Sequence, residues 1–199
     1  MSESSKGVVH VEGICRSWPG NAEALNAEDK DAILIEPLEE THPREAFSCD
    51  HPEISAYFRE RALDDHVSYK VRVRVARRAD APPIGFYSLV VGALAPKEIR
   101  GKIGRKFGKR DIPSIYLAAV AVETSEGRKG IGTVLMLDAF EKAAQIADLA
   151  GVACMTLDAV SEEKAVWYER LQFERLGTHQ DGRIKMFIPL ATLRDALAS

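Results

Sequence analysis

The pattern of apolar and polar positions is clearest in the second half of the chain. The uncharged run from Ile115 to Val122 predicts a strand that is covered on both faces. Val152 to Leu157 predicts a second apolar strand. Between them, Thr133 to Ala150 predicts a helix whose wet face carries residues at helical spacing, namely Asp138, Glu141, Gln145 and Asp148.

The first half of the chain predicts further strands and one helix. Ala32 to Ile35 reads as a strand, Pro52 to Leu63 has helical spacing, and Val67 to Ala76 alternates as a half-exposed strand does. Ala79 to Pro83 predicts a hairpin-like connection to a strand at Ile84 to Val91. Residues 1–30 are polar, and we expect an N-terminal extension whose order the sequence leaves open, followed by one domain over residues 31–199.

A glycine-bearing turn joins the first apolar strand to the long helix. Gly127, Gly130 and Gly132 let the backbone approach a ligand closely, and Arg128 and Lys129 add positive charge. The N-terminus of a helix also favours anions, so the turn suits a phosphate group. The turn lacks the Gly-Lys-Ser/Thr of a Walker loop and the Gly-x-Gly-x-x-Gly of a dinucleotide fold. The alternative interpretation is that the glycines only close the turn.

Residues after this turn help to decide between a phosphate-binding turn and a purely structural one. Ser161 predicts the cap of a helix, and residues 165–173 read Ala-Val-Trp-Tyr-Glu-Arg-Leu-Gln-Phe. Together with Gly130-x-Gly132, this segment resembles the acetyl-CoA-binding core of the GNAT N-acetyltransferases. In that family the turn reads Arg/Gln-x-x-Gly-x-Gly/Ala, and the helix often reads Ala-x-x-Phe-Tyr-x-x-x-Gly-Phe. The resemblance implies an α/β (α+β) fold with a mixed, mostly antiparallel, twisted sheet, flanking helices, and a V-shaped split between two central strands.

The resemblance extends over about residues 44–190. Residues 47–54, 57–63 and 84–89 are similar to the opening of one GNAT branch, the toxins of toxin-antitoxin pairs that acetylate the α-amine of aminoacyl-tRNA. That branch implies a ribbon-helix-helix antitoxin as a partner. GNAT proteins also frequently form homodimers through sheet edges or terminal strands, and Arg183 to Leu190 is a candidate edge strand.

The resemblance also implies residue roles. Tyr168 would protonate the departing thiolate, and Glu123 would accept the amine proton through a water. Tyr168 could instead be a packing residue, Glu123 a solvated loop carboxylate, and the amine could arrive already neutral. The cofactor, acetyl-CoA, would contact the end of the strand and the turn, at Val120, Ala121, Val122, Gly127, Arg128, Lys129, Gly130, Ile131, Gly132 and Thr133.

Three positions depart from the family pattern. Gly127 stands where Arg or Gln usually opens the turn, so Arg128 would take over that electrostatic part. Ala119 stands where the toxin branch often has an arginine, which removes one substrate contact. Gln172 replaces the usual glycine after the tyrosine helix and is expected to change only the exit from that helix.

Composition and charge bear on the substrate. The chain has 199 residues, 46% hydrophobic and 29% charged, with a net charge of −3, which gives no general attraction to nucleic acid. One segment departs from that balance, with apolar residues at helical spacing between cations. Either it faces RNA, extended by the arginines at positions 72, 74, 77 and 78, or it is a solvated surface. Its cations are Lys97, Arg100, Lys102, Arg105, Lys106, Lys109 and Arg110.

The sequence therefore leaves three functions open: acetylation of aminoacyl-tRNA, acetylation of a small-molecule or protein amine, and binding of acetyl-CoA without catalysis. Cys15, Cys49 and Cys154 lack disulfide or zinc spacing, so we expect free thiols and no metal. The apolar runs are too short to span a bilayer, and the N-terminus does not read as a secretion signal. We therefore expect a cytoplasmic protein.

Overall fold

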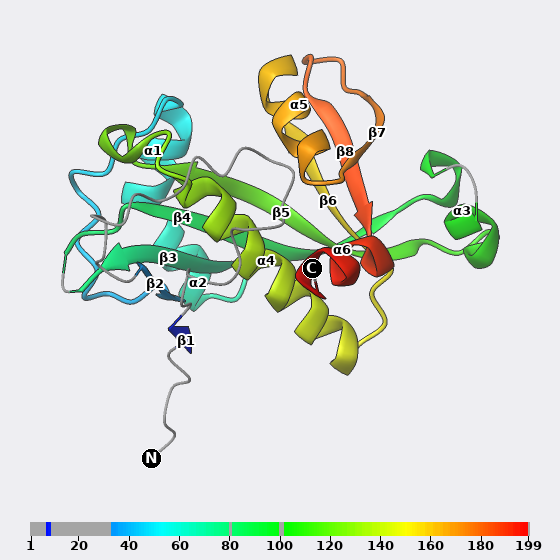
Figure 1. Cartoon of the computed structure of the whole chain (residues 1–199), viewed down its shortest axis with the longest axis horizontal. Coiled ribbons are helices and arrows are strands. Elements are labelled where there is room, and N and C mark those ends of the chain that lie inside the picture. Colours follow the sequence, from blue (N-terminus) through cyan, green and yellow to red (C-terminus); the bar gives the residue numbers. More distant parts are fainter. Residues whose placement is uncertain (1–6, 9–32, 80, 100–101, 199) are drawn as a thin grey trace. The chain divides into compact units, whose positions relative to one another are not determined.

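The computed structural model describes residues 7–8, 33–79, 81–99 and 102–198 (Figure 1). The chain separates into two compact units. The first is Met1–Leu89 with Ala119–Asp138, and the second is Val90–Ala118 with Ala139–Ser199. Each unit is described by itself below.

The described residues form eight strands, six α-helices and two short 3-10 helices. The strands are β1 (Gly7–Val8), β2 (Ile33–Pro37), β3 (Arg72–Arg78), β4 (Gly85–Leu94), β5 (Ile112–Val122), β6 (Cys154–Ala159), β7 (Glu174–Thr178) and β8 (Ile184–Pro189). The helices are α1 (Pro52–Glu60), α2 (Ala62–Val67), η1 (Pro96–Glu98), α3 (Lys102–Phe107), η2 (Thr124–Glu126), α4 (Ile131–Leu149), α5 (Glu162–Arg170) and α6 (Leu190–Ala198).

Hydrogen bonding joins the strands in the order β1-β2-β3-β4-β5-β6-β8-β7. Strands β5 and β6 pair in parallel, whereas β1–β2, β2–β3, β3–β4, β6–β8 and β7–β8 are antiparallel. This confirms the predicted mixed, mostly antiparallel sheet. The parallel ladder runs only from Ser114↔Cys154 to Leu117↔Leu157, although β5 continues to Val122. The ladder therefore stops inside β5, as a split between two central strands requires.

Three aromatic rings form the centre of the first unit. Phe58 of α1 stacks on Phe86 of β4 with centroids 4.2 Å apart, and Phe47 meets both rings edge-on. Ala121 at the end of β5 belongs to the same buried cluster. Burial of these rings fixes α1 against the strands, because aromatic pairs add about 0.5–1.5 kcal/mol beyond the area that they bury.

Two predictions about the first unit are wrong. The single helix expected at Pro52–Leu63 is two helices that meet at Arg61, and Val67, expected to begin a strand, ends α2 instead. Helix α2 buries Ala62 and His66, four residues apart, so a helical face overrides the apolar alternation that continues into β3.

The edges of the sheet also differ from expectation. Strand β8, expected at an edge, pairs with β6 on one side and β7 on the other, so β7 is the edge strand at that end of the described sheet. At the other end, Gly7 and Val8 pair with Ile35 and Leu34 of β2. Residues 1–6 and 9–30 of the expected extension lie outside the described residues, as does Cys15.

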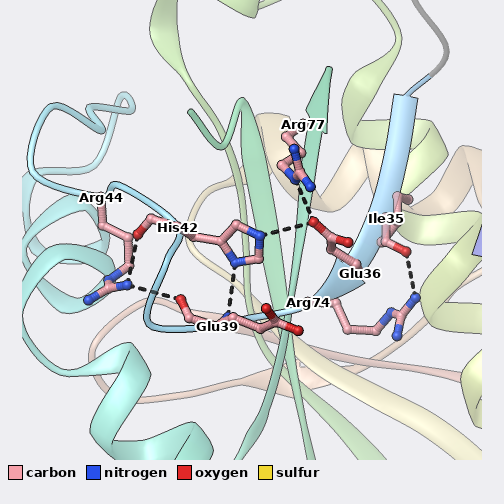
Figure 2. Close-up of polar contacts among 7 residues, drawn as sticks. All are labelled: Ile35, Glu36, Glu39, His42, Arg44, Arg74 and Arg77. Carbon is pink, nitrogen blue, oxygen red and sulfur yellow. Dashed lines mark hydrogen bonds and ion pairs between the residues drawn. The ribbon is translucent and has the colours of Figure 1, made fainter. Parts of the chain in front are cut away.

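A buried acid holds the loop that leaves β2 (Figure 2). Glu36 accepts hydrogen bonds from Arg77 Nε at 2.5 Å and from His42 Nε2 at 3.0 Å. His42 Nδ1 accepts from the Glu39 amide at 2.9 Å, which leaves Nε2 as the donor in the neutral ring. Arg44 Nη1 donates to the His42 carbonyl at 2.9 Å. These bonds fix the chain on its way to α1.

We expect Glu36→Gln to lose about 1.5–3 kcal/mol of stability at pH 7, the usual contribution of hydrogen bonds to a charged group. Burial raises the pKa of Glu36, but the bonds from Arg77 and His42 outweigh it, so the folded-state pKa lies below the usual value of 4.5. A lowered carboxyl pKa stabilises the fold above the unfolded pKa, and this stability is lost as pH falls through the folded pKa. Urea unfolding from pH 7 to 3 should therefore show a weaker pH dependence in the variant. An unchanged dependence would contradict this role for Glu36.

The second unit has its own core, in which Leu94, Ile99, Ile112, Cys154 and Phe187 are buried together. Cys49 and Cys154 are free thiols, and burial raises the pKa of Cys154 to about 12, so this thiol is unreactive. No helix among the described residues is long and apolar enough to cross a membrane.

One residue of α4 departs from its predicted exposure. Asp138, expected on the wet face, is 4% exposed, and its carboxylate accepts hydrogen bonds from Arg74 Nε at 2.8 Å and from the Tyr87 hydroxyl. Helical spacing identifies the face of a polar residue but not a buried partner from a distant strand.

Candidate functional site

The end of β5 presents backbone groups on the side away from β4. The Glu123 amide donates to the Ile84 carbonyl at 2.9 Å, so residue 123 faces the β4 side. Successive residues of a strand direct their N–H groups to opposite sides, so the amides of Val120 and Val122 face away from β4. This is the direction in which the resemblance places a cofactor.

The turn after β5 carries a run of backbone donors. Within the described residues, the amides from Arg128 to Gly132 donate no hydrogen bond, whereas the next two, of Thr133 and Val134, both bond the Gly130 carbonyl. Arg128 and Gly130 have positive φ angles of 65° and 79°. Five consecutive amides without an acceptor in the described part of the chain, at the N-terminus of a 19-residue helix, are the kind of donors that can bind an anionic group such as a diphosphate.

The start of the turn is held by side chains and by the loop before α1. One carboxylate oxygen of Glu123 accepts from the Ser125 amide at 2.8 Å and from the Ser125 hydroxyl. The Thr124 amide donates to the Ser48 carbonyl at 2.8 Å. Glu123, predicted as a catalytic base, thus has a structural role as the cap of η2.

The cations of the turn and of β3 differ in exposure and in ion pairing. Arg128 is exposed, and Lys129 Nζ lies 3.5 Å from Glu126, which also forms an ion pair with Arg78 at 2.9 Å. Arg74 and Arg77 are likewise mostly buried in ion pairs, with Asp138 and Glu36, and Arg72 lies over the Tyr69 ring. Arg74, Arg77 and Arg78 are thus held in ion pairs, whereas Arg72 is exposed and is the β3 arginine that remains a candidate for extending the RNA-facing surface.

Tyr168 lies on α5 in the second unit and is 8% exposed. Its ring packs edge-on against Trp167 and Phe173, with centroids 4.8 and 5.6 Å away. Burial, and then the nearby Tyr116, raise the pKa of Tyr168 above its ordinary value, so the phenol is protonated at neutral pH. Among the described residues its hydroxyl makes no hydrogen bond, so the O–H group remains available to donate to a bound group.

The start and exit of α5 follow from local sequence. The Ser161 hydroxyl accepts from the Lys164 amide at 3.3 Å, which confirms the predicted cap. Gln172, at the position where the family has glycine, adopts a φ of 70°. The Phe173 amide donates to the Tyr168 carbonyl at 3.1 Å. Helix α5 therefore ends in a turn of the kind that glycine usually forms, with glutamine at the left-handed position.

We expect Gln172→Gly to stabilise the protein by about 0.5–1 kcal/mol, because glycine removes the cost of a left-handed side-chain-bearing residue. Gln172→Ala retains that cost and serves as the control. Thermal unfolding measures both, and equal midpoints for the two variants would show that the turn holds no strain.

The basic segment is two short helices, not one. Pro96–Glu98 and Lys102–Phe107 are separate, and Ile99 and Phe107 pack onto the second unit's core. Arg100 lies outside the described residues, and the side chain of Lys102 is not described. Glu98, the acid of the segment, pairs with Lys185 at 2.5 Å. The remaining cations are exposed, namely Lys97, Arg105, Lys106, Lys109 and Arg110.

Sequence analysis did not identify one polar cluster in the second unit. Tyr116, Asp158 and His179 are linked through the Asp158 carboxylate, but they are 42 and 21 residues apart, on three strands or their ends. No local spacing connects such residues before the strands pair.

Comparisons with known proteins identify related chains. No protein-family model matches the chain. It is 33% identical over 129 residues to a tRNA-acetylating toxin of Mycobacterium tuberculosis, covering 65% of this chain and 76% of that protein. It is 28% identical over 174 residues to a probable toxin TacT of Sinorhizobium fredii, covering 82% and 94%.

Solved structures show the same fold at 18% identity. AtaT complexed with acetyl-methionyl-tRNAfMet has a TM-score of 0.74 and covers 81% of this chain and 97% of its own. A mutant of AtaT, bound to the C-terminus of the antitoxin AtaR and to acetyl-CoA, has a TM-score of 0.71 and covers 84% and 99%.

Proposed function

This chain belongs to the tRNA-acetylating toxins of the GNAT family, and from that premise we propose that it transfers an acetyl group from acetyl-CoA to the α-amine of an aminoacyl-tRNA. The observation that carries the proposal is the run of amides from Arg128 to Gly132, at the start of α4, that donate to no acceptor among the described residues. No other element is needed for those donors to attract a diphosphate.

The residues of the chain fit the cofactor as follows. The amides of Arg128–Gly132 bind the diphosphate, with Gly127 and Thr133 on either side of them and with Arg128 and Lys129 adding charge. The backbone of Val120, Ala121 and Val122 binds the pantetheine arm as an added strand would. Acetyl-CoA, when bound, supplies the activated acetyl group as a thioester.

Tyr168 is the proton donor in this proposal. Its raised pKa keeps the phenol protonated, and its hydroxyl has no competing hydrogen bond among the described residues. Glu123 is a weaker candidate for the base, because one of its oxygens already caps η2. An aminoacyl ester amine is less basic than a lysine amine, so its deprotonation requires only modest help.

The tRNA is proposed to contact the exposed cations of the basic segment, whose apolar neighbours Ile99 and Phe107 pack on the core of the second unit. Binding to phosphates by lysine and arginine releases counterions, so the affinity should fall with salt. The M. tuberculosis relative, a tRNA-acetylating toxin, supports this choice of substrate.

Incubation of the protein with charged tRNA and labelled acetyl-CoA tests the proposal. We expect label on the α-amine of the aminoacyl group, together with a thermal shift by acetyl-CoA alone. Transfer to amino-acid esters but not to charged tRNA would favour a small-molecule acetyltransferase. No shift at millimolar acetyl-CoA and no transfer would favour a non-catalytic module.

We expect the double variant Arg105→Ala and Lys106→Ala to raise KM for charged tRNA by about tenfold and to reduce its salt dependence, since each lost phosphate contact lowers the salt slope by about 1. Transfer to an amino-acid ester should stay unchanged. Lys70→Ala, which removes an exposed lysine of the first unit, is the matched control. An equal KM in both variants would exclude the basic segment as the RNA site.

The proposal includes an antitoxin partner, which the AtaR-bound neighbour supports, and we propose that this antitoxin is of the ribbon-helix-helix class. It also includes a homodimer and a cytoplasmic location, where charged tRNA occurs. Light scattering of the purified chain checks the dimer.

A further inference from the structure

The cluster of Tyr116, Asp158 and His179 lies entirely within the second unit. Asp158 Oδ2 accepts from the Tyr116 hydroxyl at 3.0 Å, and Asp158 Oδ1 lies 2.9 Å from His179 Nε2. The Asp158 side chain is 13% exposed and that of His179 is 37% exposed. A mostly buried carboxylate thus joins a strand residue to a partly exposed imidazole.

These contacts fix the tautomer of the histidine. Burial, and then the charge and hydrogen bond of Asp158, raise the pKa of Tyr116 to about 12, so Tyr116 can only donate to the carboxylate. Asp158 therefore accepts on both oxygens, and His179 must carry its proton on Nε2. The neutral ring then has its free lone pair on Nδ1, which is the arrangement of a histidine oriented as a proton acceptor.

A backbone hydrogen bond holds His179 in place, and two of the charged groups near its ring form an ion pair with each other. The His179 amide donates to the Arg183 carbonyl at 2.8 Å, which fixes the residue at the start of the β7–β8 turn. The charged groups facing it are Asp158, Asp181 and Arg183, and the last two pair with each other at 2.8 Å.

The cluster also reaches the proposed proton donor. Tyr116 acts electrostatically on Tyr168 and raises its pKa, and both phenols belong to the second unit. A base and an acid for one transfer reaction would thus belong to the same compact unit.

We propose that His179, oriented by Asp158 and Tyr116, is the general base that removes the proton from the attacking amine. This inference rests on the proposed acetyl transfer. As the new N–C bond forms, the amine proton passes to His179 Nδ1, directly or through one water, and the thioester C–S bond breaks. The thiolate takes the phenolic proton of Tyr168. The imidazolium then returns one proton to the phenolate through solvent, so that protons and charge balance.

The test compares His179→Gln with His179→Ala and Glu123→Gln in pH profiles of kcat/KM and kcat for charged tRNA. Gln places an amide N–H near the position of Nε2, so it preserves the bond to Asp158 but supplies no base. We expect the wild-type rate to fall at acidic pH, because only a neutral imidazole can accept the amine proton. In His179→Gln this acidic limb should be lost and kcat at pH 7 should fall at least tenfold, with the unfolding midpoint unchanged.

Two outcomes would overturn the inference. Wild-type kcat and an intact acidic limb in His179→Gln, with loss only in His179→Ala, would mean that the histidine merely ties strands together. Loss of the limb in Glu123→Gln instead would assign the base to Glu123. The same profiles recorded with an amino-acid methyl ester separate the two proposals, because a failure of tRNA as substrate leaves this test intact. Absence of transfer to either acceptor would overturn both.

Discussion

Tyr168→Phe is expected to lower kcat for acetyl transfer by about 10²- to 10⁴-fold, the range that a positioned proton donor contributes. The phenol is protonated over the whole accessible pH range because burial and Tyr116 raise its pKa. Phenylalanine keeps the ring contacts with Trp167 and Phe173 but cannot donate. The departing thiolate then has only water as a proton source.

The fold should tolerate this change, which makes the kinetic result interpretable. The Tyr168 hydroxyl has no hydrogen bond among the described residues, so its removal leaves no unsatisfied partner there. We therefore expect an unchanged unfolding midpoint and an acetyl-CoA affinity within about twofold of wild type. Tyr57→Phe, at a partly buried tyrosine of the first unit, is the matched control and should keep full activity. Activity of Tyr168→Phe within about twofold of wild type would refute the proton-donor role.

The elements around the glycine turn could be predicted because their signals are local. An uncharged run, three glycines and helical spacing follow one another directly, and the structure has β5, the turn and α4 in those places. The helix cap at Ser161 is equally local, since its bond spans three residues. Interactions of this kind join residues that are close in the sequence, so they can be predicted without knowing how the strands pair.

What could not be predicted depends on pairing between distant strands. The edge position assigned to β8 was wrong because its neighbour β7 has a weak pattern, with four of its five residues exposed. Asp138 was assigned to solvent because its partners Arg74 and Tyr87 are 64 and 51 residues away. The Tyr116, Asp158 and His179 cluster was missed for the same reason.

Asp138→Ala is expected to destabilise the protein by about 3–5 kcal/mol, the usual cost of breaking a buried ion pair from one side. Arg74 and Tyr87 are directly opposite each other in the β3–β4 ladder, and Asp138 accepts from both. With the acid removed, the bond to the Ile35 carbonyl at 2.8 Å is the one that the Arg74 guanidinium keeps among the described residues, and its side chain is only 15% exposed to water. A mostly buried cation without a counter-charge is costly, and at about 2–4 °C per kcal/mol the unfolding midpoint should fall by about 10 °C.

A second substitution separates charge from packing. In the double variant Arg74→Met and Asp138→Ala both charges are gone, so we expect it to be more stable than Asp138→Ala alone, even though it carries one more change. Glu141→Ala, at an exposed position of α4, is the matched control and should shift the midpoint by less than about 2 °C. If the double variant were less stable than Asp138→Ala, the loss would come from the missing side-chain volume and not from the unpaired arginine, and the buried ion pair would not be what joins α4 to β3 and β4.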